Sequence, residues 1–269
     1  MTDVEAPAAF YERRGNVALI TINRPEARNA VNGAVSTEVG DALQQAQDDT
    51  EVWAVVITGA GDKSFCAGAD LKAIARRENL FHPQHPEWGF AGYVRHFIDK
   101  PTIAAVNGTA FGGGTELALA SDLAVAQESA KFGLPEVKRG LIAAAGGVFR
   151  IVEQLPRKVA MQLLFTGEPI TAAEALQWGL INQVVPDGTV VEAALALAER
   201  ITVNAPLAVQ ASKRVAAGVD LQEEGATITA DEVGWSRTMR EIGALMKSED
   251  AREGPLAFAE KRQPVWKAR

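Results

Sequence analysis

The chain is poor in the residues that build disulfides and metal sites. Cys66 is its only cysteine, so no intrachain disulfide can form, and this usage fits a reducing compartment. The three histidines, His82, His85 and His96, fall in one short segment that prolines interrupt, with no cysteine nearby. Structural zinc sites need cysteines or histidines at regular spacing. We therefore expect these histidines to lie in a surface loop, Cys66 to be a small buried residue, and no metal site.

An excess of positive charge and long apolar runs are also missing. The chain has 27 basic and 34 acidic residues, for a net charge of -7, whereas nucleic-acid binders carry basic patches. No apolar run reaches the roughly 18 residues that suggest a membrane-spanning helix. The acidic N-terminal segment lacks the apolar stretch of a secretory signal, and the closing WKAR is not a peroxisomal signal. These features predict a cytoplasmic protein that binds neither nucleic acid nor membrane.

What the sequence does contain is an alternation of short β-rich runs with longer helical patterns, which is typical of an α/β protein. Strands are predicted at residues 17–23, 52–59, 102–108, 123–126 and 180–185, and helices at residues 34–47, 191–203, 207–217, 226–246 and 249–262. After about residue 190 the pattern predicts helices alone. The chain therefore divides into an α/β core, residues 1–200, and a helical C-terminal region, residues 201–269.

A weak internal repeat links two parts of the core. VVITG (residues 55–59) and AAVNG (residues 104–108) each read as a strand ending in glycine, followed by a turn of small residues and a helix. Ala69 and Gly113 each follow a glycine near such a helix start, where backbone N–H groups are unpaired. Two convergent amides would form an oxyanion hole. Close packing of a helix on a sheet explains the GGG triplet equally well, and the glycine spacing matches neither common nucleotide-binding motif.

Two acidic residues stand out near these turns. Glu116 falls in the first turn of the helix predicted after the glycine triplet, where an acidic side chain complements the helix dipole. Glu136 follows Leu134 and Pro135 and reads as an exposed turn residue. Their spacing along the chain does not by itself place them together.

Taken in order along the chain, several motifs resemble those of one known protein family. GTAFGGGTELALASD (residues 108–122) followed by KFGLPEVKRG (residues 131–140) resembles the crotonase, or enoyl-CoA hydratase/isomerase, family, and is most like enoyl-CoA hydratase. The resemblance extends over most of the chain and includes NRPEARNAVN (23–32), SFCAGADLK (64–72), AAAGG (143–147), LLFTGEPITAAEALQWGLINQVV (163–185) and FAEKRQPVW (258–266). It implies a crotonase-like spiral of ββα repeats, a C-terminal trimerisation region, and self-association as a homotrimer or a dimer of trimers.

The resemblance also implies a site. The peptide N–H groups of Ala69 and Gly113 would hold a thioester oxygen, and Glu116 and Glu136 match the two catalytic glutamates of the family's hydratases. Residues that would border the CoA arm or the acyl group are Arg24, Ala27, Arg28, Ala67, Ala69, Asp70, Leu71, Lys72, Gly112 and Ala144. No metal or separate cofactor is implied, because coenzyme A is part of the substrate.

The implied chemistry explains these residue types. Reaction at the carbon beside a thioester puts negative charge on the carbonyl oxygen, where two fixed N–H donors stabilise it. Hydration also needs a base and an acid, and paired carboxyls can supply both. The resemblance therefore implies a lyase of fatty acid metabolism that adds water to a 2-enoyl-CoA, with Glu116 deprotonating water and Glu136 protonating the α-carbon. An enoyl-CoA Δ-isomerase, another crotonase-type lyase, and a non-catalytic acyl-CoA-binding protein remain alternatives.

The sequence departs from the family at the acyl end. Typical hydratases have proline and then glycine in the loop where GLIAAAGG (residues 140–147) places Ala143 and Ala144. Ala144 keeps a backbone donor that could help to hold water. The aromatic, proline-rich segment 78–97 is expected to cover the acyl group, whereas Trp235, Trp266 and Phe258 are expected in the core or between subunits. Similar variation occurs in relatives acting on branched, hydroxylated or carnitine-like acyl groups, so the sequence does not identify the acyl group of the substrate.

Overall fold

A six-stranded sheet forms the centre of the molecule. The computed structural model describes residues 6–222 and 225–267. The strands are ordered β1 (Ala9–Arg14), β2 (Val17–Ile22), β3 (Ala54–Gly59), β5 (Thr102–Val106), β7 (Leu123–Gln127) and β10 (Gln183–Val185). Only β1 pairs in the antiparallel sense within this sheet. The strands predicted from the sequence are thus confirmed, with shifts of a few residues at their ends.

A second, smaller sheet runs beside the first and creates the repeat. Its strands are ordered β4 (Ser64–Cys66), β6 (Thr109–Phe111), β8 (Lys131–Gly133) and β9 (Ile170–Thr171). Strands β4, β6 and β8 follow β3, β5 and β7 along the chain, and helices follow them in turn: α2 (Leu71–Ala75), α3 (Gly113–Ala120) and, after the short helix η4 (Pro135–Arg139), α4 (Gly147–Gln154). The expected ββα repeats are therefore present. The segments read as turns of small residues begin with short strands that pair with one another.

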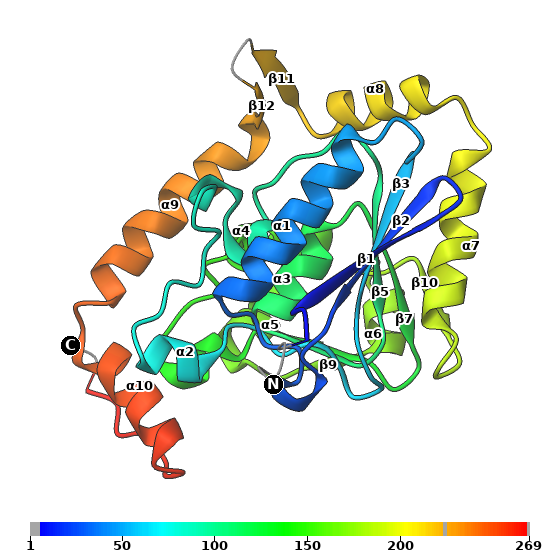
Figure 1. The fold of residues 1–269 in the computed structure, drawn as a ribbon. Helices are drawn as coiled ribbons and strands as arrows, with labels where there is room; N and C mark the ends of the chain where they lie inside the picture. The colour runs from blue at the N-terminus through cyan, green and yellow to red at the C-terminus, as the bar shows by residue number, and fades with distance from the viewer. Residues whose placement is uncertain (1–5, 223–224, 268–269) are drawn as a thin grey trace, which may run out of the picture.

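Helices cover both faces of the large sheet, as near-continuous apolar strands require. On one face, Val56 and Ile103 pack in a cluster with Leu195 of α7 (Val190–Thr202). The opposite face forms the larger core and includes residues of α1 (Gly33–Asp48) and α3. Figure 1 shows α7 on one side of the strands, with α1 and α3 on the other. The remaining helices before α8 are η1 (Pro25–Ala27), η2 (Pro86–Trp88), η3 (Phe90–Gly92), α5 (Arg157–Thr166) and α6 (Ala172–Gln177).

The C-terminal region is mainly helical, with α8 (Pro206–Ala216), α9 (Thr229–Leu245) and α10 (Glu249–Ala259). The prediction of helices alone was wrong at one place. A hairpin of β11 (Val219–Gln222) and β12 (Gly225–Ile228) precedes α9, so that helix begins after residue 226. Gly218 and Gly225 interrupt the helical pattern, and β-branched residues favour extended backbone. Helices α9 and α10 lie on the side of the molecule opposite α7 (Figure 1).

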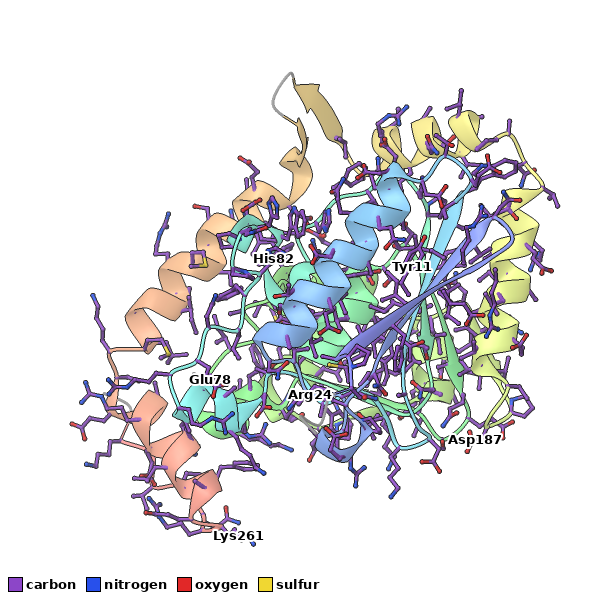
Figure 2. All side chains as sticks on the ribbon, in the orientation of Figure 1. Tyr11, Arg24, Glu78, His82, Asp187 and Lys261 are labelled. Atoms are coloured by element: carbon purple, nitrogen blue, oxygen red, sulfur yellow. The ribbon has the colours of Figure 1, made fainter. Side chains whose placement is uncertain are left out.

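Two of the three histidines contradict the expectation of a surface loop. His82 and His96 are only 2% and 9% exposed. Segment 78–97 folds against α1, where the Nε2 atom of His82 lies 3.1 Å from Asp41 and that of His96 lies 3.1 Å from Gln44; Figure 2 shows His82 beside this helix. Cys66 is buried, as expected. Within residues 6–222 and 225–267, no helix has the length and apolar character needed to cross a membrane.

Candidate active site

A cavity of about 1190 Å³ brings together every site residue named from the sequence. Its lining includes Arg24, Ala27, Arg28, Ala67, Ala69, Asp70, Leu71, Lys72, Gly112, Gly113, Glu116, Glu136 and Ala144. Segment 78–97 also borders the cavity, through Phe81, Pro86, Phe90 and Arg95 among others. These residues come from the ends of consecutive repeats, so the fold assembles at one place what the sequence spreads over more than a hundred positions.

The two segments that carry the Ala69 and Gly113 amides meet at the cavity wall. Val31 pairs with the strand around Ala69: its amide bonds to the Gly68 carbonyl, and its own carbonyl accepts the Asp70 amide. The N–H of Ala69 therefore points away from Val31. Gly113 is the first residue of α3, where a helix amide has no intrahelical acceptor. A Cβ on Gly68 would lie 3.1 Å from the Gly113 nitrogen, so the two segments are in contact.

Each of the three glycines before Glu116 is required by a different neighbour. Gly112 has a φ of +54°, and a Cβ there would lie 2.9 Å from the Oε1 atom of Glu136. A Cβ on Gly113 would overlap the ring of Phe90 at 2.3 Å. A Cβ on Gly114 would lie 1.9 Å from the Cys66 carbonyl oxygen. Close packing therefore requires glycine at residues 113 and 114, and at residue 112 a side chain would meet the Glu136 carboxyl group at the cavity wall.

Glu116 is not a surface residue that merely complements a helix dipole. It is 3% exposed and lies one turn into α3. Its Oε1 atom accepts a hydrogen bond of 2.9 Å from the backbone N–H of Gly147, at the start of α4. This bond fixes the carboxyl group at the cavity wall, and it was not anticipated from the sequence, although the AAAGG motif contains its donor.

Glu136 is likewise more enclosed than an exposed turn residue. It belongs to η4, which α10 holds in place: a Cβ on Gly254 of α10 would lie 2.0 Å from the Arg139 carbonyl oxygen. The Oε2 atom of Glu136 is buried and has no hydrogen-bond partner within the described residues. A buried carboxyl oxygen without a partner is costly unless it is protonated or meets a ligand.

The two carboxyl groups perturb one another. Burial, and then the neighbouring Glu136, raise the pKa of Glu116 to about 8, while the Gly147 and Ala145 amides act in the opposite direction. Burial raises the pKa of Glu136 to about 7, and the Arg139 charge opposes this shift. Because the groups interact, these values belong to the pair. Near neutral pH the pair retains a proton. The amides that bond to Glu116 favour its ionised form, but burial still leaves Glu116 with the higher pKa of the two, so in the free site the proton rests mainly on Glu116 and must shift to Glu136 for hydration.

The outer edge of the cavity is built around an ion pair. Nη1 of Arg24 lies 3.0 Å from Oδ2 of Asp70 and 2.6 Å from the Ala30 carbonyl oxygen. The Oδ1 atom of Asp70 accepts the amides of Lys72 and Ala73 and so caps α2. Burial raises the pKa of Asp70, but the Ala73 amide and Arg24 more than compensate and lower it. Figure 2 shows Arg24 below α1.

Several lining residues were not expected at the site. Trp235 of α9 packs in the main hydrophobic core, as predicted, and also lines the cavity. Phe258 of α10, predicted to be a core or subunit contact, is 52% exposed and lines the cavity as well. Arg95 and Arg139 also line it. Trp235 packs close to the loop beside Glu116: a Cβ on Gly146 would lie 3.3 Å from its ring. No local sequence signal places a residue of α9 against this loop.

Comparisons with known proteins agree with this arrangement. The enoyl-CoA hydratase/isomerase family model matches residues 12–269. A carnitinyl-CoA dehydratase of Escherichia coli O157:H7 is 43% identical over 261 residues, covering 96% of this chain and 97% of the relative. A crystal structure of carnitinyl-CoA hydratase from Mycobacterium avium is 80% identical, covers 98% of this chain and 99% of its own, and gives a TM-score of 0.95. An enoyl-CoA hydratase structure from Mycobacterium tuberculosis H37Rv is 43% identical, with coverage of 98% and 100% and a TM-score of 0.75. The chain belongs to the enoyl-CoA hydratase/isomerase, or crotonase, family.

Proposed function

We propose that the protein catalyses the reversible addition of water to the double bond of a 2-enoyl-CoA, which in reverse is the dehydration of a 3-hydroxyacyl-CoA. The observation that carries this proposal is the placement of two carboxyl groups, Glu116 and Glu136, in one cavity with the Ala69 and Gly113 amides. A double-bond isomerase needs one group to move a proton. Hydration uses a base and an acid together, and the site offers both.

In the proposed mechanism, the thioester oxygen accepts hydrogen bonds from the amides of Ala69 and Gly113. The ionised carboxylate of Glu116 takes a proton from water as the hydroxyl oxygen bonds to C3. The electron pair of the double bond moves toward the thioester, and the two amides stabilise the charge that develops on its oxygen. The protonated carboxyl of Glu136 then delivers its proton to C2. Water has been added without change of redox state.

After one turnover the proton has changed places, because Glu116 is protonated and Glu136 is ionised. Their coupled titration makes the return of that proton to Glu136 easy, since the two groups have similar proton affinities. Dehydration uses the same groups in reverse: ionised Glu136 removes the C2 proton, and protonated Glu116 delivers its proton to the departing hydroxyl. One site thus serves both directions.

The relatives' names bear on the acyl group. Carnitinyl-CoA is a 3-hydroxyacyl thioester whose fourth carbon carries a trimethylammonium group, so its dehydration is the same reaction with a cationic tail. The high identity to the Mycobacterium avium protein supports a shared reaction. The reaction depends on the glutamates and amides, whereas the choice of tail depends on the residues beyond them.

The experiment that tests the proposal follows the loss of enoyl-thioester absorbance with crotonyl-CoA, in the wild type and in Glu116→Gln and Glu136→Gln. Glutamine keeps the volume of each side chain, and at residue 116 it keeps an acceptor for the Gly147 amide. We expect each variant to lower kcat by a factor of a hundred or more, in line with the contribution of a positioned acid or base. Turnover that survives in both variants would contradict paired-carboxylate hydration. Thioester binding without any turnover in the wild type would instead support a binding protein.

A further inference from the structure

A buried ion pair joins α4 to α9 beside the loop that holds Glu116. The Nε atom of Arg150 lies 3.0 Å from Oδ2 of Asp231, and its Nη2 atom donates a second hydrogen bond to the same oxygen. The two side chains are only 8% and 15% exposed. Removing such a pair from water costs desolvation energy that its mutual attraction often fails to exceed. Stability of the fold alone is therefore a weak reason for the pair.

The guanidinium group of Arg150 lies back over the start of its own helix. A Cβ on Gly146 would lie 3.0 Å from its Nη1 atom, and a Cβ on Gly147 would lie 2.9 Å from Oε1 of Glu116. The cation and the carboxyl group therefore lie against consecutive residues of one loop, whose Cα atoms are about 3.8 Å apart. Two charges held this near to each other inside a protein interact appreciably.

One nitrogen of this guanidinium group lacks an acceptor. Nη1 of Arg150 is buried and has no hydrogen-bond partner within the part of the chain that the structure describes. The group is also enclosed by aromatic rings, because the ring centroids of Phe149 and Trp235 lie 5.4 and 5.5 Å from its Cζ atom. The charge that Asp231 does not cancel therefore acts through protein rather than water, where electrostatic effects are stronger.

The Glu116 carboxyl group interacts with groups from several elements. Burial, and then Glu136 of η4, raise its pKa, whereas the amides of Gly147 and Ala145 and the Arg150 charge lower it. Cys66 of β4 also faces it, and burial raises the pKa of that thiol to about 12, so the thiol is uncharged near neutral pH. Arg150 is therefore the cation that favours ionised Glu116.

Other charged or titratable groups surround Arg150 itself. They are Asp231 of α9, Glu153 one turn further along α4, Tyr93 of segment 78–97, and Arg95, which packs on the same aromatic ring. Among them Asp231 bonds to the guanidinium group directly. It therefore both holds the cation in place and offsets part of its charge.

We propose that Arg150 and Asp231 are positioning residues of the proposed hydration: the Arg150 charge favours ionised Glu116, and Asp231 holds that charge over the loop. Hydration needs the proton of the glutamate pair on Glu136, whereas in the free site it rests mainly on Glu116. A cation beside Glu116 increases the share of the productive form. This inference rests on the proposed hydratase function, because it assigns residues that act on the base of that reaction.

The pH optimum of kcat/KM for crotonyl-CoA tests the proposal in Arg150→Gln and Asp231→Asn. Asparagine keeps the volume of Asp231 and an acceptor for the guanidinium group. Loss of the cation raises the pKa of Glu116, so the optimum of Arg150→Gln should move up by roughly half a pH unit. Loss of the anion unmasks the cation, so the optimum of Asp231→Asn should move down. An optimum that stays in place in both variants, or moves the same way in both, would overturn the proposal.

Two further variants separate charge from structure. Arg150→Lys keeps the charge and should keep the wild-type optimum. A lysine variant whose optimum moves as far as that of Arg150→Gln would show that shape matters rather than charge, and would overturn the proposal. Arg214→Gln is the control, because it breaks a comparable ion pair, 3.0 Å from Asp99, at a residue outside the cavity lining. Its optimum should equal that of the wild type.

The kinetic constants should divide in a characteristic way. Arg150 is not among the described residues that line the cavity, so its charge bears on the base rather than on substrate binding. We expect Arg150→Gln to lower kcat for hydration severalfold and to leave KM nearly unchanged. A rise in KM with unchanged kcat would assign Arg150 to substrate binding and overturn the proposal.

Infrared titration keeps this inference separate from the proposed function, because it needs no turnover. A protonated buried carboxyl group gives a C=O stretching band, and its absence from Glu116→Gln assigns the band to Glu116. The titration midpoint of that band should be higher in Arg150→Gln and lower in Asp231→Asn than in the wild type. If no enoyl-CoA is turned over, the hydratase proposal fails, and opposed shifts of the midpoint would still support the action of Arg150 on Glu116. Equal midpoints in the three proteins would overturn it.

Discussion

The backbone N–H of Gly147 donates a hydrogen bond of 2.9 Å to Oε1 of Glu116, and so links the start of α4 to the first turn of α3. The bond joins two consecutive repeats of the fold. It favours the ionised form and so opposes the effect of burial, which still raises the pKa of this carboxyl group to about 8. The loop before α4 thus both positions the proposed base and makes its charge tolerable.

Gly147→Ala tests this link. A Cβ at residue 147 would lie 2.9 Å from Glu116 Oε1 and 2.8 Å from the Ala143 Cβ, so the carboxyl group must move. Small displacements of catalytic groups can cost a factor of about 100, and we expect kcat to fall about 10- to 100-fold, measured with crotonyl-CoA.

The matched control for that change is Gly243→Ala in α9, where a Cβ would meet nothing within 4 Å. It should leave kcat unchanged. Unaltered kcat in a folded Gly147→Ala protein would show that the position of Glu116 is not critical.

The pH dependence of the reaction should be bell-shaped. Hydration requires the pair to hold one proton, with Glu116 ionised and Glu136 protonated. Burial raises both pKa values above those of ordinary carboxyl groups, so the singly protonated pair, from which this form arises by proton transfer between the two carboxyl groups, is populated near neutral pH and is lost to protonation below and ionisation above. We expect kcat/KM for crotonyl-CoA to fall on both sides, with circular dichroism confirming the fold across the range. Activity that keeps rising into strongly alkaline solution would contradict the role of Glu136 as acid.

The same shifts predict how stability varies with pH. A carboxyl group whose pKa is raised in the folded protein binds its proton more tightly there than in the unfolded chain. Its contribution to stability is therefore favourable at low pH and is lost as the pH rises from about 4.5 through the folded pKa of about 7 for Glu136. Glu136→Gln removes that loss, and one pKa unit corresponds to about 1.4 kcal/mol.

Thermal unfolding measures this effect. Glu136→Gln should raise Tm by several degrees at pH 8 and by much less at pH 5. Glu241→Gln, at an exposed position of α9, is the control and should show no such dependence. A Glu136→Gln protein no more stable than wild type at pH 8 would show that the carboxyl group is not strained by burial.

The central strands were predictable because each is a local pattern. Runs such as VALITI and AVVITG are almost fully buried, and an apolar run of that length reads as a strand by itself. The three-residue strands β4, β6 and β8 carry no such signal. They exist because each pairs with a strand of a neighbouring repeat, and that pairing is not encoded within any one of them.

The site residues likewise fall into those that a local pattern predicts and those whose position depends on distant parts of the chain. Physical reasoning placed Ala69 and Gly113 at or near helix starts; Gly113 does begin α3, whereas Ala69 precedes Asp70, the N-cap of α2. Only the family resemblance brought Glu116 and Glu136 together. Neither source indicated Trp235. Its position depends on α9 returning to the loop at Gly146, which is a long-range contact that periodicity does not report.

The outer surface of the C-terminal region leads to a prediction about assembly. Val203, Leu207 and Val215 are 82%, 76% and 83% exposed. Apolar side chains exposed together often mark an interface. We therefore expect a homo-oligomer, a trimer or a dimer of trimers, by light scattering coupled to size-exclusion chromatography.

Leu207→Glu and Val215→Glu, eight residues apart on α8, place charge on this surface. A charge buried in an interface without a partner is unfavourable, so the double variant should shift the mass toward the monomer. Lys213 lies between them, and its Nζ atom is 2.7 Å from Asp122, which ties α8 to the core of its own subunit. The substituted helix therefore has a reason to stay folded when the partner is lost. A monomeric wild type would remove the proposed role of residues 201–269 in trimerisation. An unchanged mass in the double variant would place the interface elsewhere on the chain.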